Sequence, residues 1–173
     1  MELNNRPGYS KEYPQGKGED LYRRSLYTFW KRTVPSPMLK TFDAPEREFC
    51  TVQRSRTNTP LQALLLMNGP QFVEAARHLA QRMIQEGGST TDERIRHGFR
   101  LVTARTPSED EVVILREEFN SSLARIKIDG DYADAILQVG ESDVTTDVNK
   151  QELAAMATVA RLLLNLNEAI TKG

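Results

Sequence analysis

From residue 60 to about residue 170, apolar residues recur at intervals of three and four, and this feature constrains the fold of the chain most strongly. The spacing gives each of several helices one apolar stripe, and polar or glycine-containing breaks separate the helices. No stretch alternates apolar and polar residues for long enough to indicate a strand. Because each stripe must be buried against another, we predict an all-α fold, a helical bundle or orthogonal packing of about five to six helices.

Capping residues and breaks predict where these helices begin and end. Thr59 and Pro60 suit the start of a helix, which Asn68-Gly69-Pro70 ends before a second helix runs to about Glu86. The remaining expected elements are a helix capped by Asp92, a helix opened by the capping-box sequence Thr106–Glu109, a weaker helical segment over 132–139, and a last helix opened by Asn149 with Glu152 and reaching about Ile170.

The first 60 residues have a different character. Residues 1–20 contain several prolines and glycines and are expected to form a flexible leader without regular structure. Aromatic and apolar residues over 21–33 predict a helix, and residues 34–59 are expected to form a long ordered loop with a short helical turn. We therefore interpret residues 21–173 as a single helical domain, with an aromatic helix and a Pro/Arg-rich loop over 21–59 and a helical core over 60–173.

The charge of the 173-residue chain is close to balanced overall, at a net -1, but it is unevenly placed. Residues 1–60 hold 11 Lys and Arg against 7 Asp and Glu, whereas residues 61–173 hold 12 against 17. This asymmetry suits contact between the two parts, or contact between the first part and an anionic ligand. It does not suit a nucleic-acid partner, and the longest apolar run, five residues from Ala63 to Met67, is too short for a membrane span.

Side chains that carry chemistry are few. Cys50 is the only cysteine, and the only histidines, His78 and His97, are expected on helix surfaces. No metal-ligand spacing and no nucleophile motif occurs, so we expect no metal, cofactor or catalytic residue in this chain. Arginines close to Cys50 in the sequence would lower the pKa of its thiol, whereas the flanking Phe49 and Val52 favour a buried, inert thiol.

A loop rich in arginine precedes the helix that begins at Pro60. Its candidate binding residues for an anion or a partner are Arg47, Arg54, Arg56, Asn58 and Gln62. Arginine side chains beside the positive end of a helix suit an anionic group. Alternatively, the same arginines hold the loop in place by bonding carboxylates such as Asp43, Glu46 and Glu48. The sequence leaves both interpretations open.

Aromatic residues in the segment before this loop suggest a docking surface. Tyr22, Tyr27 and Trp30 lie close together in the sequence. Tyrosine, tryptophan and arginine contribute disproportionately to the free energy of protein association. We therefore treat these three aromatic residues as candidate docking residues.

Several segments share a pattern with a known family. They are Arg23–Thr33, Thr41–Arg47, Cys50, Arg56–Leu64, Asn68–Ala76, Arg94–Ile95, Phe99–Leu101, Arg105–Pro107 and Leu162–Glu168. Together they resemble the C-terminal part of the planctomycete domain of unknown function fifteen fifty-three family, from about Glu19 to Lys172. Gly69 departs from the pattern, because the family usually has aspartate in that turn, and the long upstream half of the domain has no counterpart in these residues.

The resemblance implies a C-terminal fragment of a larger, periplasmic or secreted bacterial protein that often carries a cytochrome-c-like domain. The haem attachment sequence belongs to that other domain, so no haem ligand carries over. We therefore interpret the chain as an uncharacterised helical scaffold or interaction domain without enzymatic activity of its own. Its expected partners are upstream domains of the same protein or further copies of itself. Alternatively, the arginine loop contributes a binding site for an anion, such as an acidic or sulfated saccharide, to an enzyme or receptor.

Overall fold

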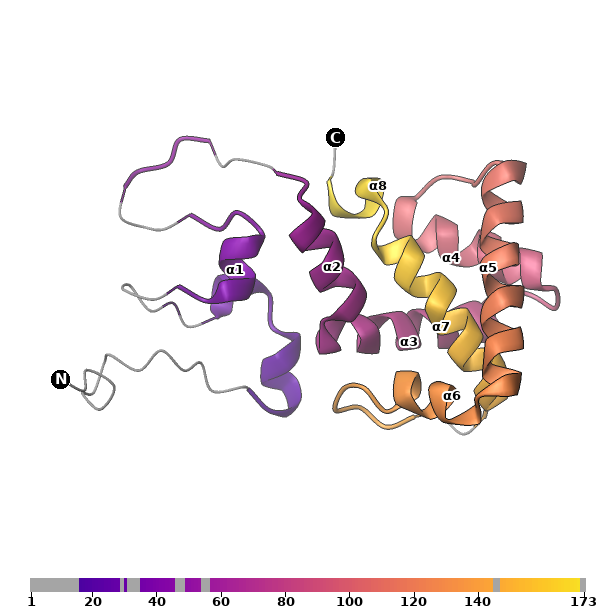
Figure 1. The fold of residues 1–173 in the computed structure, drawn as a ribbon. Helices are drawn as coiled ribbons and strands as arrows, with labels where there is room; N and C mark the ends of the chain where they lie inside the picture. Colours follow the sequence, from indigo (N-terminus) through magenta and orange to yellow (C-terminus); the bar gives the residue numbers. More distant parts are fainter. Residues whose placement is uncertain are drawn as a thin grey trace. The chain divides into compact units, whose positions relative to one another are not determined.

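The computed structural model describes residues 16–28, 30, 35–45, 49–53, 57–144 and 147–171 (Figure 1). All regular elements within these ranges are helices, which confirms the predicted all-α fold. The chain divides into two compact units, unit 1 (Met1–Gln62) and unit 2 (Ala63–Gly173). Residues 21–173, which the sequence suggests as one domain, thus span both units, and the division falls inside helix α2 (Pro60–Asn68).

Unit 1 contains short helices over its described residues. These are the 3-10 helices η2 (Gly18–Tyr22) and η3 (Ser25–Tyr27) and the α-helix α1 (Pro37–Thr41). The predicted α-helix over 21–33 is therefore wrong in its described part. Neither 3-10 helix has a side-chain N-cap, and Arg24, which lies between them, has an extended backbone. Without a cap or a continuous apolar stripe, these residues form short 3-10 helices and not one α-helix.

Two further expectations concern the ends of this unit. The sequence predicts no regular structure over residues 18–20, but they form the first turn of η2, which begins at Gly18 with a φ of 56°. This value is accessible to glycine because glycine has no Cβ. The short helical turn expected within 34–59 is confirmed by α1, and residues 1–15 and 31–34 lie outside the described residues.

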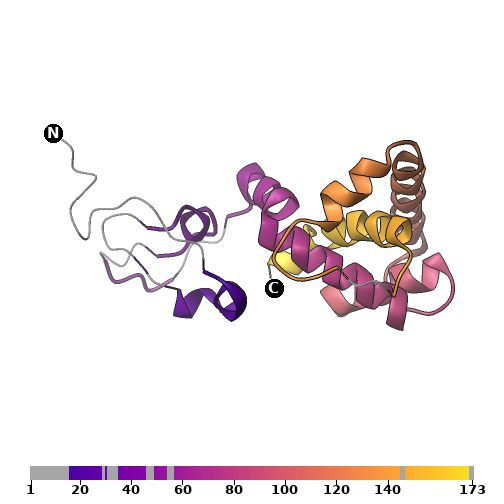
Figure 2. The same ribbon diagram turned by 90° about the horizontal axis from the view of Figure 1, so that it is seen from below.

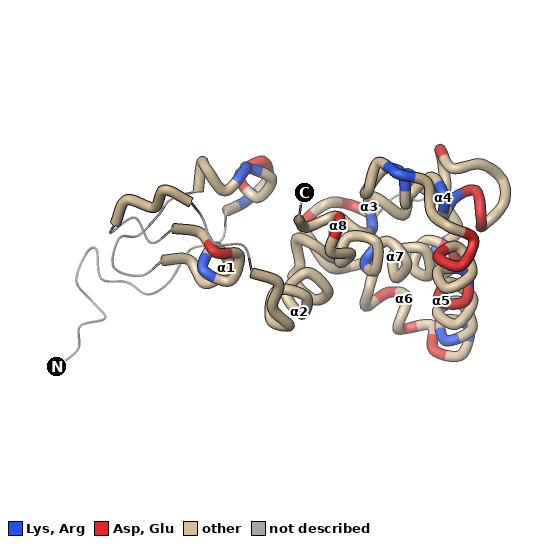
Figure 3. Tube along the Cα trace, turned by 90° about the horizontal axis from the view of Figure 1, so that it is seen from above, with Lys and Arg blue, Asp and Glu red and all other residues tan. Residues whose placement is uncertain are grey.

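Unit 2 begins with the remainder of α2, which carries no charged residue (Figure 3). It continues with α3 (Pro70–Glu86), α4 (Thr91–Thr103), α5 (Glu109–Ile128), α6 (Gly130–Leu137), α7 (Lys150–Leu164) and α8 (Asn167–Ile170). Proline at the first position of α3 follows Gly69, as the break at Asn68-Gly69-Pro70 predicts. The last predicted helix is interrupted at Asn165 and Leu166, so α8 is a separate turn.

Helix α7 is the centre of unit 2 and packs against α3, α4, α5, α6 and α8 (Figures 1 and 2). Its large side chains Leu153, Met156 and Leu163 are fully buried. Four alanines, Ala154, Ala155, Ala157 and Ala160, are also buried. Alanine side chains let neighbouring helices approach α7 closely on more than one side. The core of unit 2 therefore surrounds this helix.

The caps of α4 and α5 differ from the predicted ones by two residues. Thr90, and not Asp92, caps α4, because its hydroxyl accepts from the Glu93 N–H and the Glu93 carboxylate accepts from the Thr90 N–H. Ser108 makes the same reciprocal pair with Glu111, whereas the sequence predicts this capping box at Thr106 and Glu109. The segments before α4 and before α5 each contain more than one residue that suits an N-cap, with acidic residues after it. The spacing alone therefore does not show which residue is the N-cap.

The cap of α7 is confirmed in part. The Asn149 side-chain oxygen accepts from the backbone N–H groups of Gln151 and Glu152, as the sequence predicts. The Glu152 carboxylate bonds the Arg94 guanidinium instead of completing a capping box. Arg94 also donates to the Gly88 carbonyl, with an Nε to oxygen distance of 3.1 Å. This arginine therefore links the turn before α4 to the first turn of α7.

Candidate functional site

Five residues of unit 1 form a hydrogen-bonded group that we name the Gln62 cluster: Thr41, Asp43, Thr57, Thr59 and Gln62. The Gln62 Nε2 group donates to the Thr41 carbonyl at 2.8 Å and to the Thr57 hydroxyl at 3.0 Å. Its Oε1 accepts from the Thr59 N–H at 3.0 Å, and Thr59 Oγ1 accepts from the Gln62 N–H. The predicted start of α2 at Thr59 and Pro60 is therefore confirmed, with Gln62 completing the cap.

Asp43 extends this cluster to the end of α1. Its Oδ2 atom accepts from the backbone N–H and the hydroxyl of Thr57, at 2.8 and 2.7 Å. Asp43 has a φ of 56°, a conformation that aspartate tolerates better than most residues because its short side chain bonds locally. The cluster thus joins the two ends of the long loop, residues 41–43 and 57–62.

The predicted anion-binding residues are only partly described. Arg47, Arg54 and Arg56 lie outside the described residues. Asn58 is exposed, whereas Gln62 is only 3% exposed and its amide bonds the cluster. In this structure Gln62 therefore holds the loop, and its proposed contact with an anion would require these bonds to break.

The predicted docking residues differ in exposure. Tyr22 and Tyr27 are 61% and 64% exposed, and Trp30 is half-buried. Other large apolar side chains of unit 1 are also exposed: Leu26, Met38, Phe49, Val52 and Leu61. Among the described residues of this unit, Leu39 is the one buried large apolar side chain. Unit 1 thus presents most of its described apolar surface to solvent.

The position of Cys50 corrects the expectation of a buried thiol. Cys50 is exposed, and so are Phe49 and Val52, the two neighbours on which that expectation depends. Apolar neighbours in the sequence indicate burial only when the segment packs against a core. The described residues 49–53 are all exposed, so these neighbours do not shield the thiol.

A second polar group, in unit 2, joins α3 to the loop after α6. Arg77 is buried and donates to the Leu137 carbonyl at 2.6 Å and to the Ser142 carbonyl at 2.7 Å. Glu74 is also buried, and it accepts from the Ser142 N–H at 2.8 Å and from the Ser142 hydroxyl. Gly140 permits this close approach, because a Cβ there would lie 2.6 Å from the Glu74 carboxyl carbon.

The hydrogen bonds at Ser142 determine what this group can do chemically. A hydroxyl has one proton to donate, and Ser142 donates it to Glu74 while accepting from Arg77. His78 Nε2 lies 2.8 Å from the same oxygen and so must be the protonated nitrogen that donates to it. The Glu74 carboxylate therefore accepts the serine proton, and the same bonds hold the loop after α6 against α3.

The two histidines can be compared with their predicted positions on helix surfaces. His78 is exposed, as expected, and His97 is half-buried with its Nε2 3.3 Å from a Glu86 carboxylate oxygen. Arg82, the larger cause, and His97 both lower the pKa of Glu86.

Arg105 bonds two carboxylates at the surface of unit 2. It bonds Glu111 at the start of α5, with Nη1 to oxygen at 2.9 Å, and Glu168 in α8 at 2.8 Å. Its guanidinium carbon lies 4.6 Å from the centre of the Phe99 ring. The Arg105 guanidinium, followed by the Ser108 N–H, lowers the pKa of Glu111 to about 2. Arg105 also lowers the pKa of Glu168, so this group links three helices of unit 2 electrostatically.

The described part of the chain contains no group of three or more His, Cys, Asp or Glu side chains that could hold a metal ion. None of its helices is long and apolar enough to cross a bilayer.

Sequence reasoning missed the two polar groups of unit 2 centred on Arg77 and Arg105. Arg77 and Ser142 are 65 positions apart, and Arg105 and Glu168 are 63 apart. Helical periodicity predicts which face of a helix is apolar, but it does not predict which distant loop covers that face. A buried arginine within a predicted surface stripe has no sequence signal of its own.

Together these observations define an all-helical protein whose polar side chains fix its loops. A family model described as PSD1, protein of unknown function (DUF1553), matches residues 3–119. This range is more than half of the chain, which therefore belongs to the DUF1553 family. The match ends within α5, so α6, α7 and α8 lie beyond it. No curated protein and no solved structure matches the chain.

Proposed function

We propose that this chain is a non-catalytic helical interaction domain that docks, through unit 1, onto upstream domains of its own protein. The observation that carries the proposal is the exposure of Tyr22, Leu26, Tyr27, Phe49 and Val52 in a unit with one buried large apolar side chain among its described residues. Several large apolar side chains exposed within one short unit favour association with a partner. The docked domains then form a larger assembly outside the cytoplasm.

The two units contribute differently to this function. Unit 2 has a core of buried leucine, methionine, phenylalanine and alanine side chains and supplies a stable body. Among the described residues of unit 1, the Gln62 cluster and not such a core holds the loop ends, and Tyr22 and Tyr27 remain accessible. Residues 1–60 also carry a net charge of +4, from 11 basic and 7 acidic residues. An acidic and apolar partner surface would complement unit 1 best.

The proposal is tested by measuring the affinity of the whole chain for the separately expressed upstream segment of the same protein. Binding is expected for the wild type and is expected to weaken at least about tenfold when Leu26 and Tyr27 are both replaced by serine. Leu101→Ser, at an exposed apolar position of α4, is the matched control and is expected to leave the affinity unchanged. Absence of wild-type binding, or an equal effect of the control, would contradict the proposal.

The proposed location needs its own experiment. In the natural host, fractionation followed by immunodetection is expected to find the protein in the periplasm or the medium. Recovery in the cytoplasmic fraction alone would contradict an extracytoplasmic role.

A second candidate function is anion binding by the arginine loop. The Gln62 cluster supports it, because it fixes Thr57 and Asn58 directly after Arg54 and Arg56 at the start of α2. A fixed loop end next to a helix N-terminus favours binding of a sulfate or carboxylate group. Sulfate or a sulfated saccharide should then raise the melting temperature of the wild type but not of Arg56→Ala. An equal rise in both proteins would exclude this site.

A further inference from the structure

Helix α5 has one exposed face that its contacts within unit 2 leave uncovered. The buried residues of α5 are Val112, Leu115, Phe119, Ser122 and Ile126. Along one stripe the exposed residues are Ile114, Glu117, Ser121, Ala124, Arg125 and Ile128, with Asp110 before them, and Val113, Asn120 and Lys127 form an adjacent exposed row. At 3.6 residues per turn, the six positions of the stripe, which form the exposed face, fall within an arc of about 100° on the side opposite the buried residues. Ile114 and Ile128 are 63% and 88% exposed.

The residues of this face are arranged symmetrically about Ser121. Ile114 lies seven positions before Ser121 and Ile128 lies seven positions after it. Glu117 lies four positions before it and Arg125 four positions after it. An antiparallel copy of α5 would therefore place isoleucine against isoleucine at both ends and glutamate against arginine on both sides of the centre.

We propose that α5 pairs with α5 of a second copy of this chain, antiparallel, with the two-fold axis at Ser121. The arrangement forms two Ile114–Ile128 contacts and two Glu117–Arg125 ion pairs between the copies. Ser121 and Ala124 are small, so the helices approach closely where they cross. The same surface patch serves on both chains, as a two-fold interface requires.

Charge complementarity selects this second copy as the occupant and sets its direction. In a parallel pair, Glu117 would face Glu117 and Arg125 would face Arg125, which is unfavourable. In the antiparallel pair, each carboxylate faces a guanidinium. The isoleucines at the ends can contact each other in a parallel or an antiparallel pair. The charged residues therefore determine the direction and the register.

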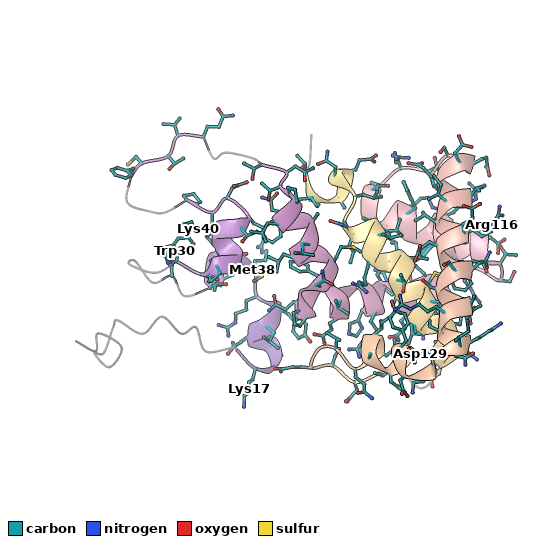
Figure 4. The ribbon with its side chains drawn as sticks, in the orientation of Figure 1. Lys17, Trp30, Met38, Lys40, Arg116 and Asp129 are labelled. Carbon is teal, nitrogen blue, oxygen red and sulfur yellow. The ribbon has the colours of Figure 1, made fainter. Side chains whose placement is uncertain are left out.

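Arg125 is already oriented in the isolated chain. Its guanidinium carbon lies 4.0 Å from the centre of the Tyr132 ring of α6. Stacking on the ring uses the face of the guanidinium, whereas its N–H groups point outward in the plane and can donate to a carboxylate. The six residues of the face run from Ile114 to Ile128, so the face extends over most of α5, and Figure 4 labels Asp129, which follows Ile128 at the end of the helix.

This inference concerns α5 alone and does not depend on docking through unit 1. Standard protein interfaces bury at least about 1,200 Å², and a single helix pair buries less. We therefore expect a dissociation constant of about 10–100 μM for the dimer. Sedimentation equilibrium of the whole chain measures it directly. The Leu26→Ser/Tyr27→Ser variant described above should dimerise like the wild type.

A charge exchange tests the register. Glu117→Arg and Arg125→Glu should each weaken dimerisation at least about tenfold, because each places like charges together twice. The double variant should restore it to within about threefold of the wild type, since the pairs are re-formed in reverse. Lys127→Glu makes the same charge change as Arg125→Glu outside the face and is the matched control, with no loss expected.

Crosslinking gives a second, independent measurement. Ser121→Cys in a Cys50→Ser background should form a covalent dimer under mild oxidation, because the two copies meet at this position. Cysteine at Lys127 in the same background should not. A chain that stays monomeric at about 1 mM, a dimer insensitive to Glu117→Arg, or a double variant that fails to recover would each overturn the proposal.

Discussion

Gly98 lies where α4 contacts α3. Its replacement by alanine has two opposite effects on the free energy of unfolding, one from helix preference and one from packing. In a helix interior, alanine is favoured over glycine by about 1 kcal/mol. A Cβ at Gly98, however, would lie 2.5 Å from Met83 Sδ and 2.7 Å from both Met83 Cε and Cγ. These separations are far below van der Waals contact, and Met83 is completely buried.

The packing effect is therefore expected to be the larger one. Overpacking a filled core costs about 1–3 kcal/mol, and three close contacts to a side chain with no free space place Gly98→Ala near the upper end. Subtracting the helix preference leaves a net loss of about 1–2 kcal/mol. For a chain of this size, the melting temperature should fall by about 3–6 °C. Thermal unfolding followed by circular dichroism measures this change.

Two variants make the interpretation specific. Gly130, the first residue of α6, has open space where a Cβ would lie, with no atom within 4 Å, so Gly130→Ala should stabilise the chain slightly or leave it unchanged. In a Met83→Ala background, the space beside Gly98 is open and Gly98→Ala should become stabilising. If Gly98→Ala raised the melting temperature in the wild-type background, the described contact between α3 and α4 would be wrong.

Three more predictions concern the polar groups. Arg105, with the Ser108 N–H, lowers the pKa of Glu111 from 4.5 to about 2, so the stability that the Glu111 carboxylate contributes is present above pH 4.5 and is lost as the pH falls through about 2. Glu111→Gln should therefore flatten the acidic part of a plot of unfolding free energy, measured in urea, against pH. An unchanged plot would argue against the ion pair. Ser142→Ala removes the hydroxyl bonds to the charged, buried Glu74 and Arg77 while the backbone bonds of residue 142 remain, and it should cost about 1–3 kcal/mol, with faster hydrogen exchange in residues 138–144 if the loop detaches. Gln62→Ala should speed limited proteolysis between residues 43 and 57, whereas equal cleavage rates would show that the Gln62 cluster does not hold the loop.

The helices of unit 2 could be predicted from the sequence because each has a strong local signal. The apolar stripe of α3 and the break at Asn68-Gly69-Pro70 are both readable along a few consecutive residues. The caps of α4 and α5 were less predictable, since Thr90 and Asp92 both suit an N-cap and only the packed structure decides between them. The sequence therefore predicted which helices exist better than it predicted the residue at which each helix begins.

The candidate site was harder to predict for a physical reason. Gln62 resembles a ligand-binding residue because it follows an arginine-rich loop, but its amide is used by Thr41, Thr57 and Thr59. The apolar neighbours of Cys50 predict its burial, but unit 1 offers its described residues little core to pack against. Both outcomes depend on contacts between residues that are distant in the sequence, and periodicity carries no information about these contacts.

The central position of α7 has a consequence for synthesis of the protein. Helices α3 to α6 all bury side chains against residues 150–164, which the ribosome makes after them. Until that segment leaves the exit tunnel, the nascent helices have no common surface to close on and expose their apolar stripes to chaperones. Folding of unit 2 should therefore be completed by α7 in a late, cooperative step, after residues 150–164 have been made.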